Sequence, residues 1–429
     1  MKITLAQIRL KTGDFEFNFE SVRRAVEKAQ GDVIVLPDIT SLGEKGLLRD
    51  KEFVAAKNDF IKRVAGLGKT IITGKILICD GKILEHTAAS ILSENIPFGL
   101  PVPDVQIYVN AVCQADENVY AGGSFVRGIY QAPLCEEVIY EVSCHPGLRA
   151  GVSAKRSEFE TPHQVRGDMV DIITVTTFAL REYCENTGFK KVILGLSGGL
   201  DSAVVAALAV QALGAESVKG VLLPSMYSSE GSVTDALQLA KNLGIETETH
   251  PITPMFEKFM GTFDARQDLA EENLQSRLRM LHLMFLANRE GRLLLATGNK
   301  SEIAMGYGTL YGDMAGGFNM IADLTKTWVY KIAEHLPAVP RETIEKPPSA
   351  ELRPGQKDSD SLPEYAILDD IIEMYLEQKH EALYAKYDKA LVDDVIKRIC
   401  RAQFKRKQAC LGVRLTEHGF DFPIVQRYY

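Results

Sequence analysis

The most constraining feature of this chain is the segment SGGLDS, Ser197 to Ser202, which directly follows the apolar, strand-like run KVILGL. A glycine-rich turn between a strand and a helix lets backbone amides approach an anion closely. Ser197 and Ser202 add hydroxyl donors, and the following helix AVVAALAVQAL presents its positive end to the same place. The segment therefore predicts an oxyanion site, which in such turns usually holds phosphate.

The same loop restricts the phosphate chemistry. It lacks the GK[ST] ending of a Walker motif, so no lysine is supplied to a terminal phosphate as in the usual kinases and ATPases. Asp201 would repel a bound phosphate unless a divalent cation lay between them. Glu302 follows the run RLLLATG, and ligands of open α/β sheets collect at the carboxyl ends of strands. We expect Asp201 and Glu302 to share a magnesium ion; the alternative is that Glu302 is a solvated helix residue.

Strand-like and helical patterns alternate along most of the 429 residues. Residues 1 to about 150 contain short β-rich runs between helical patterns, which predicts an α/β domain. From about residue 160 the alternation is regular and predicts a parallel, doubly wound sheet. A proline-rich, charged loop after Pro347 leads into a mostly helical tail. We therefore expect two domains, residues 1–150 and 160–429.

Composition narrows the class of protein. A formal net charge of −8 argues against nucleic-acid binding, so local lysines, arginines or a metal must meet any anionic substrate. The seven cysteines are scattered without a CxxC pair, which suits a reducing compartment and disfavours structural zinc. No run of about eighteen apolar residues predicts a membrane span. We expect a soluble, cytoplasmic protein that binds neither membranes nor nucleic acid.

Several segments beyond residue 160 resemble successive motifs of NAD synthetases, a branch of the ATP pyrophosphatases: ENLQSRLRM, ATGNKSEIAMGYGTLYGDMAGGFN, DLTKTWVY and PPSAELRPGQKDSDSLPEY. The resemblance implies that ATP adenylates the nicotinate carboxylate of deamido-NAD and that ammonia then displaces AMP. The glycine-rich loop would hold the β and γ phosphates as leaving pyrophosphate. Because adenylation joins two anions, magnesium and cationic groups are expected to offset the repulsion.

The same resemblance assigns the site residues. The implied ATP contacts are Gly195, Leu196, Ser197, Gly198, Gly199, Leu200, Asp201, Ser202, Arg277, Thr297 and Ser349. The implied deamido-NAD contacts are Asn273, Glu302, Tyr307 and Lys405, and the implied catalytic residues are Asp201, Glu302 and Lys326. Arg277 and Lys326 match family positions near the phosphates. The alternative interpretation is that both are exposed charges on helices. Met226 stands where many relatives carry a basic residue.

The amino-terminal half resembles the nitrilase-like glutaminase domain of many NAD synthetases in the segments MKITLAQI, GDFEFNFE, VIVLPD and NAVCQADENVYAGGSF. Such a domain uses a Glu, Lys and Cys triad. Asp38 stands at the Glu position, the text between the matching segments is short, and no segment matches the lysine or cysteine motif. Cys79 and Cys135 have acidic neighbours but no matching context. The pattern predicts a truncated, inactive domain.

Together these features favour an ammonia-dependent NAD synthetase, a homodimer or larger homo-oligomer, that acts on deamido-NAD, ATP and ammonia. NAD synthetases generally build the deamido-NAD site across a two-fold interface, which implies the dimer. Two alternatives remain open: a glutamine-dependent NAD synthetase, and another ATP-pyrophosphatase amidotransferase resembling GMP synthetase, which would leave ENLQSR and PPSAELRP unexplained. The amino-terminal half could instead be a binding or oligomerisation module.

Overall fold

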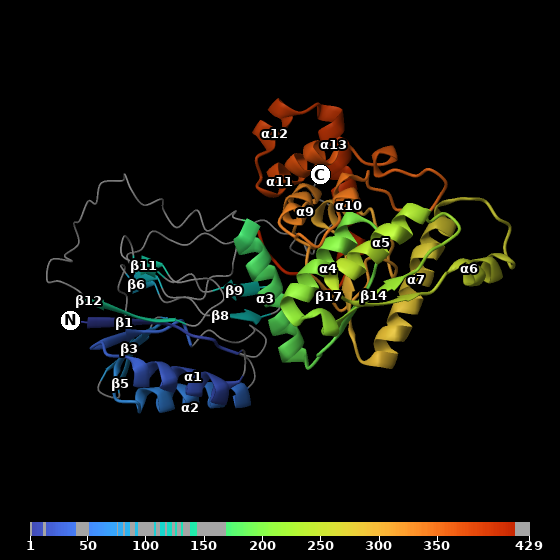
Figure 1. The fold of residues 1–429 in the computed structure, drawn as a ribbon. Helices are drawn as coiled ribbons and strands as arrows, with labels where there is room; N and C mark the ends of the chain where they lie inside the picture. Colours follow the sequence, from blue (N-terminus) through green and yellow to red (C-terminus); the bar gives the residue numbers. More distant parts are fainter. Residues whose placement is uncertain are drawn as a thin grey trace. The chain divides into compact units, whose positions relative to one another are not determined.

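The chain divides into two compact units, Met1–Val175 and Thr176–Tyr429, shown as a ribbon in Figure 1. The computed structural model describes residues 2–11, 14–39, 51–74, 76–79, 82–85, 91–92, 107–108, 112–115, 118–121, 125–126, 130–131, 138–143 and 169–416. The division at residues 150 and 160 inferred from the sequence stays a prediction.

The first unit is built on a six-stranded sheet with strand order β12-β1-β2-β3-β4-β5. The strands are β1 (Lys2–Gln7), β2 (Val33–Val35), β3 (Thr70–Thr73), β4 (Ile76–Cys79), β5 (Lys82–Glu85) and β12 (Val138–Ser143). Strands β1, β2 and β3 are parallel, because the helices α1 (Phe15–Lys28) and α2 (Lys51–Ala65) provide the crossovers between them. The outer strands β12, β4 and β5 pair antiparallel.

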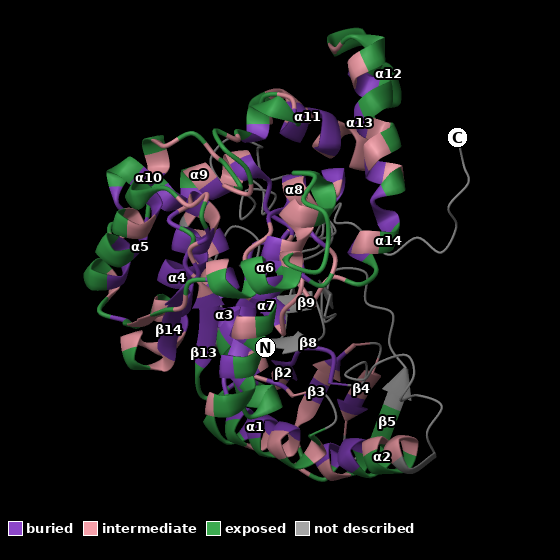
Figure 2. Ribbon diagram, turned by 90° about the vertical axis from the view of Figure 1, so that its right-hand side faces the viewer, coloured by how far each residue is buried: buried purple, intermediate pink, exposed green. Residues whose placement is uncertain are grey.

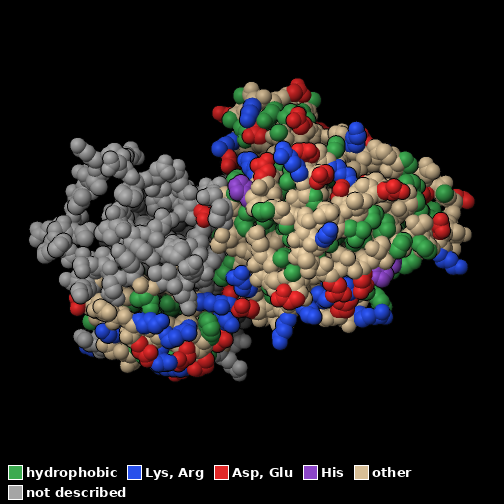
Figure 3. Space-filling view, viewed as in Figure 1, with side chains coloured by type: hydrophobic (Ala, Val, Ile, Leu, Met, Phe, Trp, Pro, Cys, Tyr) green, Lys and Arg blue, Asp and Glu red, His purple; other side chains and the backbone are tan. Residues whose placement is uncertain are grey.

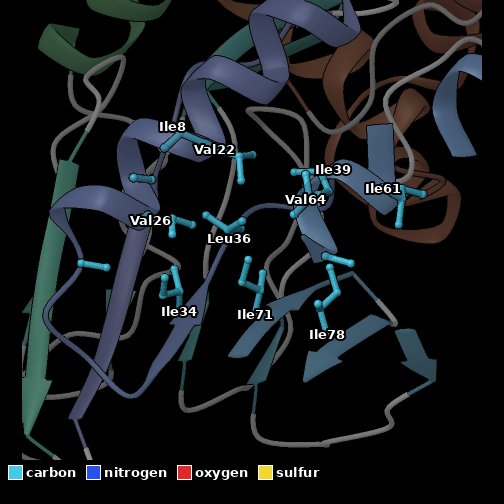
Figure 4. Close-up of a cluster of buried hydrophobic side chains, with 14 of the residues drawn as sticks. Ile8, Val22, Val26, Ile34, Leu36, Ile39, Ile61, Val64, Ile71 and Ile78 are labelled. Atoms are coloured by element: carbon cyan, nitrogen blue, oxygen red, sulfur yellow. The ribbon is translucent and has the colours of Figure 1, made fainter. Parts of the chain in front are cut away.

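An apolar cluster joins this sheet to its two helices (Figure 4). Val22 and Val26 project from α1 and Val64 from α2, toward Ile34 of β2 and Ile71 of β3. Residues four apart on a helix lie on one face, and this face of α1 is buried while the charges at Arg23 and Glu27 stay outside. The apolar face of the amphipathic helix α1 is thus buried in one small α/β core.

Shorter strands follow in the first unit. They are β6 (Ile91–Leu92), β7 (Ile107–Tyr108), β8 (Val112–Ala115), β9 (Asn118–Ala121), β10 (Phe125–Val126) and β11 (Tyr130–Gln131). Four of them form a sheet in the order β11-β10-β7-β6, and β8 and β9 pair as an antiparallel hairpin.

The second unit contains a five-stranded sheet in the order β15-β14-β13-β16-β17, with parallel pairing throughout. Its strands are β13 (Val192–Gly195), β14 (Val218–Leu222), β15 (Glu246–Thr249), β16 (Leu293–Ala296) and β17 (Phe318–Asn319). The chain runs outward from β13 to β15 and then returns to β16 on the other side of β13. This reversal confirms the predicted doubly wound sheet and places a topological switch point between β13 and β16.

Helices cover the second sheet. They are α3 (Met169–Thr187), α4 (Leu200–Leu213), α5 (Glu230–Leu243), α6 (Thr253–Met260) and α7 (Leu269–Glu290). Helix α4 is buried along most of its length (Figure 2), because it lies against the sheet and also packs against α5 and α9. Its nearly continuous apolar sequence reflects this burial on more than one side.

The carboxyl-terminal part is helical, as predicted. Its helices are α8 (Lys300–Met305), α9 (Lys326–Glu334), α10 (Arg341–Glu345), α11 (Tyr365–Leu376), α12 (His380–Lys386), α13 (Lys389–Arg401) and α14 (Gln403–Arg406). An apolar cluster that includes Met305, Leu368, Leu383 and Val395 packs α8, α11, α12 and α13 together. The tail is therefore anchored on α8, which follows β16.

Charged groups, rather than apolar ones, hold the polar edge strand β15 in place. Lys219 of β14 is almost fully buried, and its Nζ lies 2.7 Å from Glu248 of β15, 2.6 Å from Glu290 of α7 and 3.3 Å from Glu246. Burial alone would lower the pKa of Lys219, but the hydrogen bonds to Glu248 and Glu290 raise it above its usual range. The ammonium thus ties β15 to the end of α7.

Acidic and basic side chains of the described residues are interspersed over the face shown in Figure 3. No helix in the described ranges is long and apolar enough to span a lipid bilayer.

Candidate active site

The glycine-rich loop lies between the end of β13 and the first turn of α4. Gly198 has a φ of +77°, and a Cβ atom at this position would lie 2.1 Å from the carbonyl oxygen of Ser232. The Ser202 hydroxyl donates to Gly199 O at 3.0 Å, and Ser197 Oγ lies 3.1 Å from Ser202 Oγ. Gly199 caps α4 without a side-chain hydrogen bond. The loop is therefore a compact turn that leaves the positive end of α4 open to an anion.

A buried ammonium group lies beside this loop. Lys326, the first residue of α9, is 2% exposed; its Nζ pairs with Asp201 Oδ2 and lies 4.0 Å from Glu302 Oε1. Asp201 is in the first turn of α4 and Glu302 in the first turn of α8, so both carboxylates follow the carboxyl ends of strands. The structure brings the three predicted catalytic residues together around one point.

Asn299, which the sequence analysis missed, positions both carboxylates. Its Oδ1 accepts a hydrogen bond from Glu302 N at 3.0 Å, and Glu302 Oε2 accepts one from Asn299 N at 3.3 Å, which forms a capping box for α8. Its Nδ2 donates to Asp201 Oδ1 at 2.9 Å. The Asn-x-x-Glu spacing after a strand is the sequence signal that could have identified this residue.

The pKa values of Glu302 and Lys326 are shifted by burial and by the charges of neighbouring side chains. Burial, together with the nearby charges of Asp201 and Asp358, raises the pKa of Glu302 well above its usual range, against the opposing effect of Lys326. The pKa of Lys326 is itself raised, because Asp201 and Glu302 outweigh the effect of its burial. One ammonium therefore faces an excess of carboxylate, an arrangement that favours an additional cation.

A magnesium ion was expected between Asp201 and Glu302. Within the described ranges, no group of three or more His, Cys, Asp or Glu side chains is arranged to hold a metal ion. Mg²⁺ commonly binds one or two carboxylates and completes its shell with water and substrate phosphates. The two carboxylates fit this mode of binding, with the remaining ligands supplied from outside the protein.

A third carboxylate, also missed from the sequence, faces the same centre. Asp358 is buried; its Oδ2 accepts a hydrogen bond from Tyr365 at 2.8 Å and its Oδ1 one from Tyr307 at 3.2 Å. Tyr307 was predicted to contact deamido-NAD, and in this structure its hydroxyl is engaged by Asp358. Burial and the Asp358 charge raise the pKa of Tyr307 above its usual range.

The predicted deamido-NAD contacts Asn273 and Lys405, together with the predicted ATP contact Arg277, gather around the segment 306–310, which follows α8. Asn273 Oδ1 accepts from the Thr309 hydroxyl at 2.7 Å, and Arg277 Nε donates to Leu310 O at 3.2 Å. Lys405 Nζ donates to Gly306 O at 2.8 Å and to Gly308 O at 2.7 Å. Burial lowers the pKa of Lys405. Side chains from α7 and α14 thus meet on one short segment.

The remaining predicted ATP contacts lie at strand ends or on the loop after α10. Gly195 ends β13, Leu196 and Leu200 are buried, and Thr297 directly follows β16. Ser349 is exposed, and its hydroxyl donates to Gln356 O at 2.6 Å.

Arg279 binds the start of the loop that follows β14, in which Met226 stands. Met226 is exposed in the loop after this strand. Arg279 of α7 donates from Nε to Leu223 O at 3.0 Å, and burial lowers its pKa to about 10. The sequence analysis missed Arg279, although it lies two residues after Arg277 in the ENLQSRLRM segment.

In the amino-terminal unit, Asp38 follows β2 and is buried. Gly74, with a φ of +54°, lies against it, and a Cβ atom there would come within 2.5 Å of Asp38 Oδ1. Cys79 ends β4, two strands away in the sheet, and is a free thiol. Cys135 lies outside the described residues.

The doubly wound sheet, with a glycine-rich loop and half-buried carboxylates at its switch point, defines an α/β protein with the arrangement in which open sheets hold ligands at their strand ends. Comparison with known families then gives a specific assignment. The family model described as NAD synthase matches residues 172–409. The chain belongs to the NAD synthase family.

Two relatives illustrate the likeness. A glutamine-dependent NAD(+) synthetase of Thermotoga maritima is 48% identical over 267 residues, which cover 58% of this chain and 46% of that protein. One of Synechocystis sp. is 42% identical over 344 residues, or 75% of this chain and 61% of that protein. The chain thus spans roughly half to two thirds of the length of these relatives.

Solved structures match along the whole chain. A glutamine-dependent NAD+ synthetase from Acinetobacter baumannii, in complex with ADP, has a TM-score of 0.70 at 26% identity and covers 100% of this chain and 98% of that one. One from Cytophaga hutchinsonii has a TM-score of 0.76 at 15% identity, covers 99% of this chain and 97% of that one, and shows likeness of fold alone. These matches confirm the predicted fold class, an α/β synthetase unit preceded by a nitrilase-like unit.

The preference for ammonia as the nitrogen donor is wrong. The relatives, including the 48% identical protein from Thermotoga maritima, are glutamine-dependent NAD synthetases. The preference rested on failing to match short segments around the expected lysine and cysteine. Sequence identity of 48% over 267 residues and of 42% over 344 residues outweighs these local differences.

The geometry of the glycine-rich loop predicts the effect of one substitution. Gly198→Ala should weaken ATP binding at least about tenfold, because the added Cβ meets Ser232 O and the φ is unfavourable for alanine. Gly244→Ala is the matched control, since Gly244 has a φ of +67° but open space around it. Equilibrium dialysis with ATP measures the difference; equal affinities would contradict the assigned role of the loop.

Proposed function

We propose that this protein converts deamido-NAD to NAD by ATP-dependent amidation, through an adenylated nicotinate carboxylate, with glutamine as the nitrogen source. The observation that carries the proposal is the placement of Lys326 against Asp201 and Glu302, directly beside the glycine-rich loop. Membership of the NAD synthase family supports the same reaction.

In the proposed reaction, the loop binds the β and γ phosphates of ATP. Amides at the start of α4 and the hydroxyls of Ser197 and Ser202 donate to the phosphate oxygens, which replaces water by fixed dipoles. Lys326 neutralises charge that develops as pyrophosphate leaves. The protein needs no covalent nucleophile in the synthetase unit, because AMP itself becomes the leaving group on the carboxylate.

Asp201 and Glu302 would hold a magnesium ion. When bound, it would withdraw charge from the triphosphate and ease attack by the substrate carboxylate. The buried, raised-pKa carboxyl of Glu302 is stabilised in its charged form by a cation, so metal and Lys326 act on the same pair of side chains.

The substrate assignments rest on the segment 306–310. Asn273, Arg277 and Lys405 all hydrogen-bond to it. Tyr307 lies in the same segment, five residues after Glu302, so deamido-NAD bound here would have its carboxylate near Glu302 and the glycine-rich loop. This arrangement supports Asn273, Glu302, Tyr307 and Lys405 as deamido-NAD contacts.

The proposed glutamine dependence assigns hydrolysis of glutamine to the amino-terminal unit. The curated relatives at 39% to 48% identity that carry this activity in their names support the assignment. Asp38 stands where the glutaminase resemblance places the general base. We also propose that the unit is a shortened form, because segments resembling its start and end both lie within residues 1–125.

The donor assignment has a direct test. Purified protein supplied with deamido-NAD, ATP and magnesium should form NAD with glutamine as donor, and glutamate should appear in equal amount. Ammonium chloride is run in parallel, and contaminating ammonium is removed enzymatically from the glutamine. Formation of NAD with ammonium but not with glutamine would contradict glutamine dependence. Absence of NAD with both donors would contradict the proposed reaction.

The roles of Asp201 and Glu302 predict strong effects of neutral substitutions. Asp201→Asn and Glu302→Gln should each lower kcat by about 10²-fold, the usual worth of a positioned electrostatic group. Asp393→Asn, on the exposed face of α13, is the matched control and should retain activity. Near-normal turnover of both site variants at millimolar magnesium would rule out the shared-cation arrangement.

An apolar stripe on α7 supports the proposed homodimer. Leu281 is 57% exposed and Phe285 53% exposed, with Met284 beside them. They follow Arg277 at intervals of three and four residues, so the stripe continues the helix face that carries a proposed substrate contact. A second copy of the chain is the occupant that would both cover this stripe and complete the adjacent site.

The dimer is tested by charge substitutions on this stripe. Leu281→Glu together with Phe285→Glu should halve the mass measured by light scattering and raise the KM for deamido-NAD. Leu237→Glu, on an exposed apolar residue of α5, provides the control. An unchanged mass for the double variant would place the interface elsewhere.

A further inference from the structure

The first turn of helix α9, which begins with Lys326, is capped by groups from two other helices. Its own N-cap residue, Thr325, makes no side-chain hydrogen bond to a helix amide. Instead, the amide of Thr327 donates to Asp369 Oδ2 of α11 at 2.8 Å, and the amide of Lys326 donates to Ser301 Oγ of α8 at 2.9 Å. The first amides of a helix have no partner within it, so an oxygen from outside must accept them. Helices α11 and α8 therefore fix the place where α9 begins.

The two acceptors are joined to each other. Ser301 donates its single hydroxyl hydrogen to Asp369 Oδ1, which leaves its lone pairs for the amide of Lys326. Asp369 is 3% exposed and Ser301 is 0% exposed, so neither can readily exchange these partners for water. Asp369 thus links the first turn of α8 to the first turn of α9 through one carboxylate, with one oxygen bonded to each helix.

This carboxylate bridge lies directly behind the charged centre. Glu302 is the residue after Ser301 on α8. The side chain of Lys326 starts from the backbone that the bridge fixes, and it brings Nζ to a position 4.0 Å from Glu302 Oε1. The hydrogen bonds of Asp369 thus reach the residue before Glu302 and Thr327, the residue after Lys326.

We propose that Asp369 is a positioning residue, which holds the Lys326 ammonium and the Glu302 carboxylate at the spacing that departure of pyrophosphate requires. The inference rests on the proposed function, in which Lys326 neutralises charge on the leaving pyrophosphate. A charged group that must meet charge developing in the transition state loses much of its effect when it is displaced by about 1 Å. Asp369 acts on the reaction through Lys326 and Glu302, at one remove from the reacting atoms.

Both halves of the bridge require a carboxylate. Asp369→Asn keeps an oxygen for one helix and places an NH2 group against the other. In one orientation the NH2 group donates to Ser301 Oγ, which deprives the Ser301 hydroxyl of its acceptor; in the other it faces the amide of Thr327, donor against donor. The substitution therefore breaks one link of the bridge while it hardly changes the volume of the side chain.

The kinetic test uses the full-length protein with deamido-NAD, ATP, magnesium and glutamine. Asp369→Asn should lower kcat about tenfold or more and leave the KM for ATP within about twofold, because Lys326 acts on charge that appears after binding. Ser301→Ala, which removes the bridge from its other side, should lower kcat similarly. The double variant should be no slower than the slower single variant, because both substitutions break the same link.

The matched control is Asp370→Asn, the same substitution at the next position of α11, where the carboxylate pairs with Lys386. This variant should keep the kcat of the unaltered protein. Unchanged kcat in Asp369→Asn and Ser301→Ala overturns the proposal. Losses that multiply in the double variant overturn it as well, because they would show that the two residues act separately.

Chemical labelling of lysine provides a second readout that needs no turnover. In the unaltered protein, Lys326 should resist acetic anhydride, because it is 2% exposed and paired with Asp201. In Asp369→Asn, mass spectrometry should show that Lys326 reacts about tenfold faster, through local opening of the first turn of α9. Lys219, which is also 2% exposed, should stay protected. Ser301→Ala carries the same prediction and replaces Asp369→Asn if that variant does not fold.

The labelling result separates this inference from the proposed reaction. Faster labelling of Lys326 in proteins that form no NAD would keep the positioning role of Asp369 and contradict only the amidation reaction. Equal labelling of Lys326 in the unaltered protein and in both variants overturns the positioning role. Labelling of Lys219 together with Lys326 overturns it too, because that result would show general loosening of the fold.

Discussion

The site depends on the burial of one ammonium group, that of Lys326, against two carboxylates. A buried lysine without an anion would favour loss of its proton, and Asp201 and Glu302 placed side by side would repel each other. Lys326 keeps its proton because of the two carboxylates, and the two carboxylates can lie close together because Lys326 offsets their repulsion. Since they belong to α9, α4 and α8, their mutual attraction also holds the first turns of these helices together at the carboxyl edge of the sheet.

The carboxylates at the carboxyl edge of the sheet outnumber the ammonium group of Lys326, and this excess of negative charge bears on the proposed chemistry. Asp358 adds a third carboxylate beside Glu302, so the local carboxylates outnumber the one buried ammonium. A cation brought in with a triphosphate would restore the balance, which is the electrostatic requirement for joining two anionic substrates. The segment between α10 and α11 that carries Asp358 also carries Ser349, so a single segment supplies both a carboxylate of the site and a predicted phosphate contact.

The nitrogen donor illustrates a limit of motif reasoning. The loop and the strand-end residues that we propose to bind phosphate are short and local, and their patterns could be interpreted directly. Glutamine use depends on a whole domain, in which few positions have a fixed local context. Similarity along several hundred residues to glutamine-dependent enzymes therefore corrected an inference that rested on two unmatched segments.

The sequence by itself determined the class of fold and the position of the anion loop. The alternation of apolar strands and helices specifies a parallel sheet. The strand-to-helix turn needs a residue that tolerates a positive φ, and the sequence has glycine at that position, Gly198. Asp201 and Glu302 could be placed because each follows a strand. The order of strands and helices along the sequence was sufficient to place these two carboxylates.

Only the tertiary structure decided the partners of those residues. Asn299 reaches Asp201 across 98 positions, Tyr307 reaches Asp358 across 51, and Ser232 reaches Glu351 across 119. None of these separations matches the period of a helix or a strand, so no local pattern marks them. They arise because packing of α4, α5, α8 and residues 346–362 brings distant polar groups together and removes part of their contact with water, which hydrogen bonds between them replace.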